Sequence, residues 1–238
     1  SERLQRSYSL ALGCIGRDGN YDASPAATEV IHLYNHKLVI LMGIAAGIKR
    51  KAKLGEVNFS EQVLGYEKAA LYQSKDNSKK TEFRPEILSV SNIIYQDITF
   101  YLANYKEEDS IFKERLMSTF NDIGGAIPDL CNDGRFHGYQ QNDVVQKIEI
   151  DTCTIASGEK LLKDPQFLED IRDNQHGKVK IGEMESIGFA KACQNMQKSW
   201  LVIRGVSDFG DDSKNDIFQP LASKAAAAVM VDFLKHGL

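Results

Sequence analysis

The chain has 238 residues, of which 42% are hydrophobic and 26% charged, enough for one large domain with a generous core. Its formal net charge of −4 excludes a broad nucleic-acid-binding surface, because no excess of cations is available to neutralise phosphates. No apolar run approaches the length that crosses a membrane, and four scattered cysteines without a CxxC pair fit a reduced compartment.

We therefore predict one domain over residues 1–238, located in the cytoplasm and binding neither nucleic acid nor membrane. No linker rich in Pro, Gly and Ser divides the chain. The sequence opens at Ser1 without a methionine, so a native segment can precede it in a longer polypeptide.

The first part of the chain predicts two strands with a helix between them. Residues 7–14 (SYSLALGC) and 38–42 (LVILM) predict the strands, the second apolar throughout as in a buried parallel strand. Ser24 followed by Pro25 predicts the N-cap and the first position of a helix that runs to residue 34. The small residues 43–47 predict a turn.

Residues 56–64 (EVNFSEQVL) alternate polar and apolar side chains, which predicts a strand nearer an edge or a rim of the sheet. The polar residues 73–85 predict a loop. The second half alternates helices with β-branched strands, which indicates βα units and a largely parallel sheet. Its predicted elements are a helix at 107–120, an irregular excursion at 121–141, strands at 144–156, 178–184 and 200–206, and helices at 165–172, 186–196 and 221–234.

Polar residues stand at several predicted strand ends, where parallel α/β sheets bind their ligands. Ser157 and Gly158 follow one strand and either line a pocket or cap a helix. Glu183 and Glu185 stand at the next strand-to-helix junction, where capping alone could explain one of them.

Arg204 is the strongest signal from the residues themselves, because it interrupts the apolar strand at 200–206. A buried arginine is costly unless it is paired, so a carboxylate partner is expected, with Glu185 and Asp208 as candidates. A structural ion pair and a functional site are both open interpretations. The basic residues 49–53 (KRKAK) read as a solvated loop or as a clamp for substrate phosphates.

Four stretches, in this order, resemble the methylthioadenosine/S-adenosylhomocysteine nucleosidases and the purine and uridine phosphorylases. They are LVILMGIAAGIKRKAKLGEVNFSEQVLGYE (38–67), TIASGEKLL (154–162), KIGEMESIGFAKAC (180–193) and LVIRGVSDFGDDSKNDIF (201–218). The resemblance nearly spans the chain, and the pairing of EMES with RGVSD is specific. It implies a three-layer α/β/α fold with a central mixed, largely parallel sheet, whose first strand is missing or lies upstream.

The resemblance also implies roles for individual residues. Asp208 matches the aspartate that protonates N7 of the departing purine, and Ser207 supports its placement. Glu185 matches the glutamate that binds the ribose hydroxyls, and Arg204 the arginine near the attacking water. The other implied substrate contacts are Ile44, Ala45, Ala46, Met184, Leu161, Leu162 and Phe218, with Leu161 and Leu162 replacing aromatic stacking by aliphatic packing. Glu183 has mainly a structural role.

The chemistry that this implies is purine N-ribosyl hydrolysis without a metal or other cofactor. A purine anion is a poor leaving group, so N7 must receive a proton as the bond breaks, and Asp208 must carry that proton in a site shielded from water. Glu185 can strengthen its hydrogen bonds as positive charge develops on the ribose. The expected substrate is an adenine nucleoside or nucleotide.

Two departures from the family pattern affect this interpretation. Leu41 and Ile44 stand where hexameric phosphorylases carry the arginine and serine that hold phosphate, so water is the better nucleophile. The opening strand that delivers a water-activating glutamate is not found, and Glu29 and Glu56 do not replace it. A phosphorylase and a non-catalytic nucleoside-binding domain of a signalling or immune protein therefore stay open as alternatives. The family also implies a homo-oligomer, which can be fused to other domains.

Overall fold

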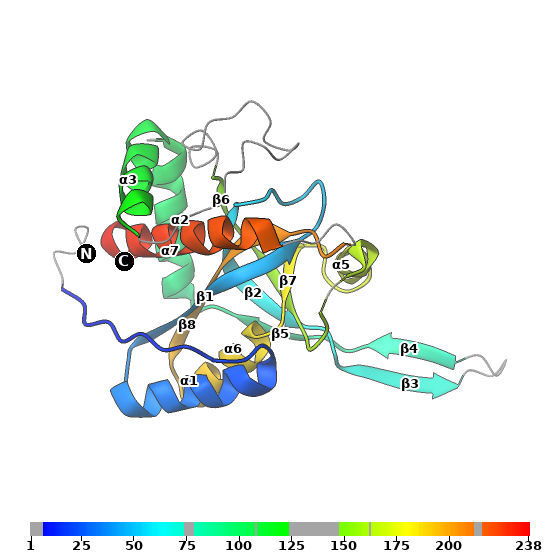
Figure 1. Ribbon diagram of the computed structural model, residues 1–238. Coiled ribbons are helices and arrows are strands. Elements are labelled where there is room, and N and C mark those ends of the chain that lie inside the picture. The colour runs from blue at the N-terminus through cyan, green and yellow to red at the C-terminus, as the bar shows by residue number, and fades with distance from the viewer. Residues whose placement is uncertain (1–6, 74–78, 108, 124–147, 162, 212–215) are drawn as a thin grey trace.

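The computed structural model describes residues 7–73, 79–107, 109–123, 148–161, 163–211 and 216–238. Five strands follow one another between residues 38 and 89, and strands and helices alternate from residue 150 onward (Figure 1). The helices are α1 (Asn20–Tyr34), α2 (Asn92–Glu107), α3 (Asp109–Asp122), α5 (Pro165–Asn174), α6 (Ser186–Asn195), the 3-10 turn η2 (Asp216–Phe218) and α7 (Gln219–His236). The strands are β1 (Leu38–Gly47), β2 (Val57–Gly65), β3 (Ala69–Gln73), β4 (Lys79–Phe83), β5 (Glu86–Ser89), β6 (Ile150–Ser157), β7 (Val179–Glu183) and β8 (Ser199–Asp208).

Six strands form one central sheet in the order β5-β2-β6-β7-β1-β8, and β2 also pairs with β8. Strands β2, β6 and β7 are parallel to one another, and β1 is parallel to β8. The pairs β1–β7, β2–β8 and β2–β5 are antiparallel. The sheet is therefore mixed, as predicted, and the β2–β8 pairing closes it on itself.

Helices cover the sheet from both sides (Figure 1). On one side α1 packs against α6, and on the other α7 lies on β8 with α3 beside it. Helix α7 approaches β8 closely because Gly205 has no side chain: a Cβ there would lie only 2.1 Å from the carbonyl oxygen of Ala222 on α7. The predicted three-layer α/β/α class is confirmed.

The start of the chain differs from its prediction. Residues 7–19 contain no strand or helix, and Leu10 and Leu12 are exposed. The predicted strand at 7–14 is wrong because β-propensity stabilises a strand only beside a partner. Helix α1 begins at Asn20 rather than after Ser24, and Pro25 lies inside it.

Two further predictions along the sheet are wrong. The small residues 43–47 continue β1, which pairs with β8 as far as Ala46. Strand β2 does not lie at an edge, because β5 and β6 flank it and β8 also pairs with it. Its polar side chains at Asn58 and Ser60 are buried, so the alternation that suggests a solvated face marks the interior of the closed sheet.

The predicted loop at 73–85 is wrong, because it includes all of β4, which pairs with β3 in an antiparallel ladder from Ala69–Phe83 to Gln73–Lys79. This ladder projects away from the body (Figure 1). Helix α2 is an element that the sequence pattern did not predict. Most of the predicted excursion at 121–141, and the first residues of the strand predicted at 144–156, lie outside the described residues.

From residue 150 onward the predicted order of strands and helices is confirmed, with ends that differ by one to a few residues. One stretch, Asp216–His236, is long and apolar enough to cross a membrane by length and composition alone. Half of its most apolar window is buried, as in the core helix of a globular domain.

The packing of α7 on β8 predicts the effect of adding one methyl group to Gly205. The Gly205→Ala variant forces backbone apart at the Ala222 carbonyl, so the free energy of unfolding falls by about 3 kcal/mol or more. Gly177→Ala is the matched control, because a Cβ there meets nothing within 4 Å. Urea denaturation checks both variants, and an equal, small change in both would contradict this packing.

Candidate active site

Arg204 lies in the middle of β8 with only 4% of its surface exposed. Its Nη2 donates to Oε2 of Glu183 and, over 3.0 Å, to Oε2 of Glu185. Of the two expected partners Glu185 is found, and Glu183 is an additional one. A guanidinium shared by two carboxylates satisfies the requirement that a buried charge be paired.

Gly43 makes this arrangement possible. It lies opposite Arg204 in the parallel β1–β8 ladder, and a Cβ at this position would come within 2.1 Å of Nη1 of Arg204. The small residues at 43–47 therefore leave room for the arginine to lie across β1. Their smallness indicates close approach by a side chain rather than a turn.

Glu183 ends β7 and holds the start of α6 as well as Arg204. Its carboxylate accepts hydrogen bonds from the backbone N–H groups of Glu185 (3.1 Å) and Ser186 (3.0 and 3.1 Å). Four N–H groups at a helix N-terminus lack partners within the helix, and Glu183 accepts from two of them, those of Glu185 and Ser186. Its expected structural role agrees with these contacts.

Glu185 is the more exposed of the two carboxylates, with 16% of its side chain accessible. Burial raises its pKa, and the nearby charge of Glu183 raises it further, against the opposing effect of Arg204. One oxygen accepts a hydrogen bond from the N–H of Gly19 at 3.2 Å. The segment before α1 therefore covers one side of this carboxylate.

Asn20, at the start of α1, joins this cluster without having been predicted. Its Oδ1 accepts from the N–H of Gly188 (2.8 Å) and from the hydroxyl of Ser157 (3.2 Å), which itself accepts from the N–H of Ile187 (3.0 Å). Ser157 thus caps α6 from a neighbouring strand. Local sequence preferences do not identify Asn20, because its side chain contacts α6, far away in the sequence, and does not cap its own helix.

Asp208 ends β8 and is 7% exposed. Its oxygens accept from the Ser207 hydroxyl at 2.9 Å and from the N–H of Gly210 at 2.8 Å. In the β1–β8 ladder the partner of β1 moves from Val206 directly to Asp208, so Ser207 is the extra residue of a β-bulge. Bulges of this kind re-aim side chains next to functional sites.

Strand β1 joins the two acidic ends. Ala46 lies opposite Asp208 on β8 and opposite Gly182, next to Glu183, on β7. One strand of small residues therefore separates the Asp208 carboxyl from the Glu183–Glu185 junction. A buried arginine, two carboxylates and a further enclosed carboxyl group share this part of the sheet.

A sequence model described as "Phosphorylase superfamily" matches residues 10–235. The chain belongs to the phosphorylase superfamily.

Similar proteins in this superfamily include nucleosidases. An ATP nucleosidase Cap17 of Escherichia coli (strain KTE188) is 37% identical over 240 residues, covering 100% of this chain and 44% of that protein. A 5′-methylthioadenosine/S-adenosylhomocysteine nucleosidase of Lysinibacillus sphaericus is 24% identical over 90% of this chain and 76% of its own length. The chain thus spans less than half of the Cap17 relative.

Solved structures share the fold. The 5′-methylthioadenosine/S-adenosylhomocysteine nucleosidase of Neisseria meningitidis, in complex with methylthio-immucillin-A, superposes with a TM-score of 0.61 at 18% identity. The alignment covers 92% of this chain and 78% of the other. At this level of identity the likeness concerns the fold, which agrees with the superfamily assignment.

The other predicted site residues of this phosphorylase-superfamily chain have different surroundings. Ala45 and Ala46 are buried in β1, and Ile44 and Met184 are partly exposed. Leu161 is 58% exposed, whereas Phe218 is 1% exposed and belongs to the apolar core. Leu162 lies outside the described residues.

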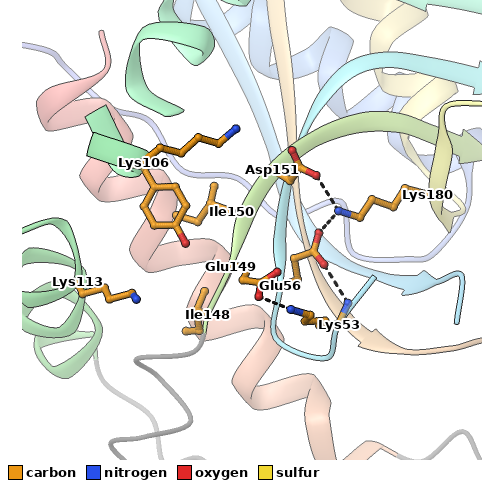
Figure 2. Close-up of a pocket in the computed structure, with 10 residues that line it drawn as sticks. Lys53, Glu56, Lys106, Lys113, Ile148, Glu149, Ile150, Asp151 and Lys180 are labelled. Carbon is orange, nitrogen blue, oxygen red and sulfur yellow. Dashed lines mark hydrogen bonds and ion pairs between the residues drawn. The ribbon is translucent and has the colours of Figure 1, made fainter. Parts of the chain in front are cut away.

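A separate pocket of about 690 Å³ lies where β2, β6 and β7 begin (Figure 2). It is at the opposite end of these strands from Glu183 and Ser157, and none of its lining residues belongs to the predicted site. Lys180 on its wall pairs with Glu56 and Asp151, and Lys53 with Glu149. Lys53, the last residue of the basic run at 49–53, therefore lines this pocket.

The raised pKa of Glu185 predicts a pH dependence of stability. The folded state holds a proton on Glu185 more tightly than the unfolded state does. In the unfolded state the pKa of this glutamate has its ordinary value of 4.5. The stabilising contribution is complete below that pH and is lost as the pH rises through the folded pKa. As the pH rises from 4.5 through the folded pKa of Glu185, the free energy of unfolding of the native chain should therefore fall relative to that of Glu185→Gln.

Urea denaturation at a series of pH values from 4 to 8 measures this difference. Glu29→Gln is the control, because Glu29 is exposed on α1. A difference between the native chain and Glu185→Gln that stays constant, or grows in the opposite direction, would show that burial does not dominate at Glu185.

Proposed function

We propose that this chain is a purine N-ribosyl hydrolase that cleaves the N-glycosidic bond of an adenine nucleoside or nucleotide, giving free base and a ribosyl product. The observation that carries the proposal is the enclosed Asp208 carboxyl group, one strand away from the Arg204–Glu183–Glu185 cluster. The similarity to a protein named ATP nucleosidase and to nucleosidases that act on methylthioadenosine supports the adenine substrate.

Asp208 is the proposed general acid, which donates a proton to N7 of the purine as the C1′–N9 bond breaks. The Ser207 hydroxyl suits this task, because its oxygen lies 2.9 Å from Asp208 Oδ2 and 3.4 Å from the carbonyl oxygen of Ala45. The Ser207 hydroxyl donates to Asp208 Oδ2, so it stabilises the carboxylate that is left when the acid gives its proton to N7.

Glu185 and Arg204 are the proposed partners of the sugar and the nucleophile. The electron pair of the breaking bond leaves with the protonated base, so the ribose gains oxocarbenium character. The Glu185 carboxylate strengthens its hydrogen bonds to the ribose hydroxyls at that stage. Arg204 orients the water that adds to C1′, and the proton released from this water passes to the water-activating glutamate and then to solvent.

The proposed substrate-binding residues are Ile44, Ala45, Ala46, Met184, Ser207, Leu161, Leu162 and Phe218. The exposure of Leu161 suits a rim position that a bound base covers. Phe218 is packed in the core, so its proposed role is to support the pocket wall.

Hydrolysis is favoured over phosphorolysis because Leu41 and Ile44 offer no donors to phosphate. We infer that a segment beyond the elements described here supplies the water-activating glutamate. Among the described residues, β1 pairs on the β7 side only through Ala46 and Gly47. The remaining edge of β1 is therefore available to another strand that could carry this glutamate.

A nucleotide substrate would require cations near its phosphates. Lys49 pairs with Asp211 over 2.5 Å, and Lys53 with Glu149. Arg50 and Lys51, between them, are exposed and are the residues of this run that we propose for a phosphate contact. The composition and the family support a cytoplasmic homo-oligomer as the working assembly.

Asp208→Asn tests the acid directly. The amide keeps the shape of the side chain but has no proton to donate, so kcat should fall about 100- to 10,000-fold with an unchanged thermal unfolding curve. Chromatography of released adenine measures turnover. Asp173→Asn, on the exposed end of α5, is the control, and near-normal turnover by Asp208→Asn would refute the acid assignment.

The nucleophile and the substrate are tested together in one panel. Adenosine, methylthioadenosine, AMP and ATP are each incubated with the protein with and without inorganic phosphate. Without added phosphate we expect free adenine and a ribosyl product that carries a hydroxyl group, and no phosphate, at C1′. A strict phosphate requirement would favour the phosphorylase, and binding without release of base would favour a nucleoside-binding domain.

A further inference from the structure

Strand β2 directs three polar side chains toward the interior of the closed sheet. Glu56, just before the strand, and Asn58 and Ser60 within it alternate along the chain, so they lie on one face. All three are buried, Asn58 and Ser60 completely. Buried polar groups are nearly always hydrogen-bonded, so each of these side chains requires a partner.

Two of the three have their partners among the described residues. Glu56 forms an ion pair with Lys180 and accepts a hydrogen bond of 2.9 Å from the N–H of Lys53. The Ser60 hydroxyl oxygen accepts from the N–H of Val202 at 3.0 Å. Asn58 lies between them, and neither Oδ1 nor Nδ2 of its amide has a hydrogen-bond partner in the part of the chain that the structure describes.

The residue opposite Asn58 is Arg204. The two are directly paired in the antiparallel β2–β8 ladder, which places their Cβ atoms about 5 Å apart on the same face. Nε of Arg204 is also buried, and it too has no partner among the described residues. An acceptor, Oδ1 of Asn58, and a donor, Nε–H of Arg204, therefore face each other across one ladder step.

We propose that Asn58 is a positioning residue for Arg204. Its Oδ1 accepts a hydrogen bond from one enclosed water molecule, which in turn accepts from Nε–H of Arg204. The inference rests on the proposed function only in the role given to Arg204, which is to orient the attacking water. The pairing of the two side chains stands independently of that role.

The physical reason for such a residue lies in how Arg204 is held. Both carboxylates, Glu183 and Glu185, contact the same atom, Nη2. Both contacts act at one nitrogen, so a further contact at Nε restrains the guanidinium at a second corner of its plane. A fixed plane is what a group that orients a nucleophile requires, since small errors in placement are costly in rate.

The first readout is the Nε–H signal of Arg204 in a ¹⁵N-correlated NMR spectrum, assigned by its loss in Arg204→Lys. We compare Asn58→Leu, which removes the acceptor, with Asn58→Asp, which keeps an acceptor oxygen. Hydrogen exchange of Nε–H should become about tenfold faster in Asn58→Leu and stay slow in Asn58→Asp with a downfield shift. Thr154→Val is the control, because Thr154 is equally buried on β6, and it should change neither quantity.

The second readout is turnover of the substrate that the panel above identifies. Asn58→Leu should lower kcat about ten- to hundredfold with KM nearly unchanged, and Asn58→Asp should recover most of the rate. A merely structural role would instead leave kcat of the folded fraction unchanged.

The NMR result decides the inference even if no nucleoside is cleaved. Exchange and shift of Arg204 Nε–H that are unchanged in folded Asn58→Leu would overturn it. Should Asn58→Leu fail to fold, an unaltered Nε–H shift in Asn58→Asp would overturn it in the same way. Absence of turnover in the native chain with intact Asn58–Arg204 coupling would sink the hydrolase proposal alone.

Discussion

The burial of one guanidinium inside a closed sheet is the constraint on which the rest of the site depends. Removing Arg204 from water is expensive, and the cost is offset only by close carboxylates and further hydrogen bonds. Glu183 and Glu185 supply the carboxylates, and the N–H groups at the start of α6 in turn share the charge of Glu183. Three consecutive features of the chain, the end of β7, its turn and the first residue of α6, are thereby fixed by a single charge on β8. Gly43 on β1 is fixed by the same charge, because any side chain there would occupy the place of the arginine.

The cluster also explains why Glu185 differs from an ordinary surface glutamate. One arginine cannot fully compensate two neighbouring carboxylates, and Glu185 is the one that gains no N–H groups of α6. Burial and the charge of Glu183 therefore raise its pKa. A carboxylate whose charge is incompletely compensated by the protein can gain more from a partner with hydroxyl groups or developing positive charge than a fully compensated one can. The same imbalance that costs stability in the folded chain thus favours the proposed contact with ribose.

Much of this could be predicted from the sequence, and what could not has a physical pattern. An arginine in an apolar strand, followed by Ser207 and Asp208, indicated both the site and one true partner, Glu185, because buried charge leaves few alternatives. The small residues at 43–47 misled, since a turn and a close approach by Arg204 demand the same composition. The alternation of polar residues at Asn58 and Ser60 predicted a solvated strand, but both side chains are buried because β2 pairs with β8. That pairing joins residues far apart in the chain, so the local pattern could not reveal it. The start of α1 was misplaced because its anchors, Glu159 and Glu185, are also distant in sequence.

Closure of the sheet connects these observations. Closing a sheet requires local curvature, which β-bulges provide, and register shifts occur in β2 next to Glu61, in β7 at Lys180 and in β8 at Ser207. Two of these irregularities coincide with charged or polar residues that have other contacts: Lys180 pairs with Glu56, and Ser207 donates a hydrogen bond to Asp208. Arg204 and Asp208 are therefore carried by one rigid strand with a bulge between them, so their separation is set by backbone geometry rather than by loop conformation. A site whose proposed acid and cation share a single strand can be held to the tolerance that bond cleavage needs, provided that the arginine itself cannot rotate.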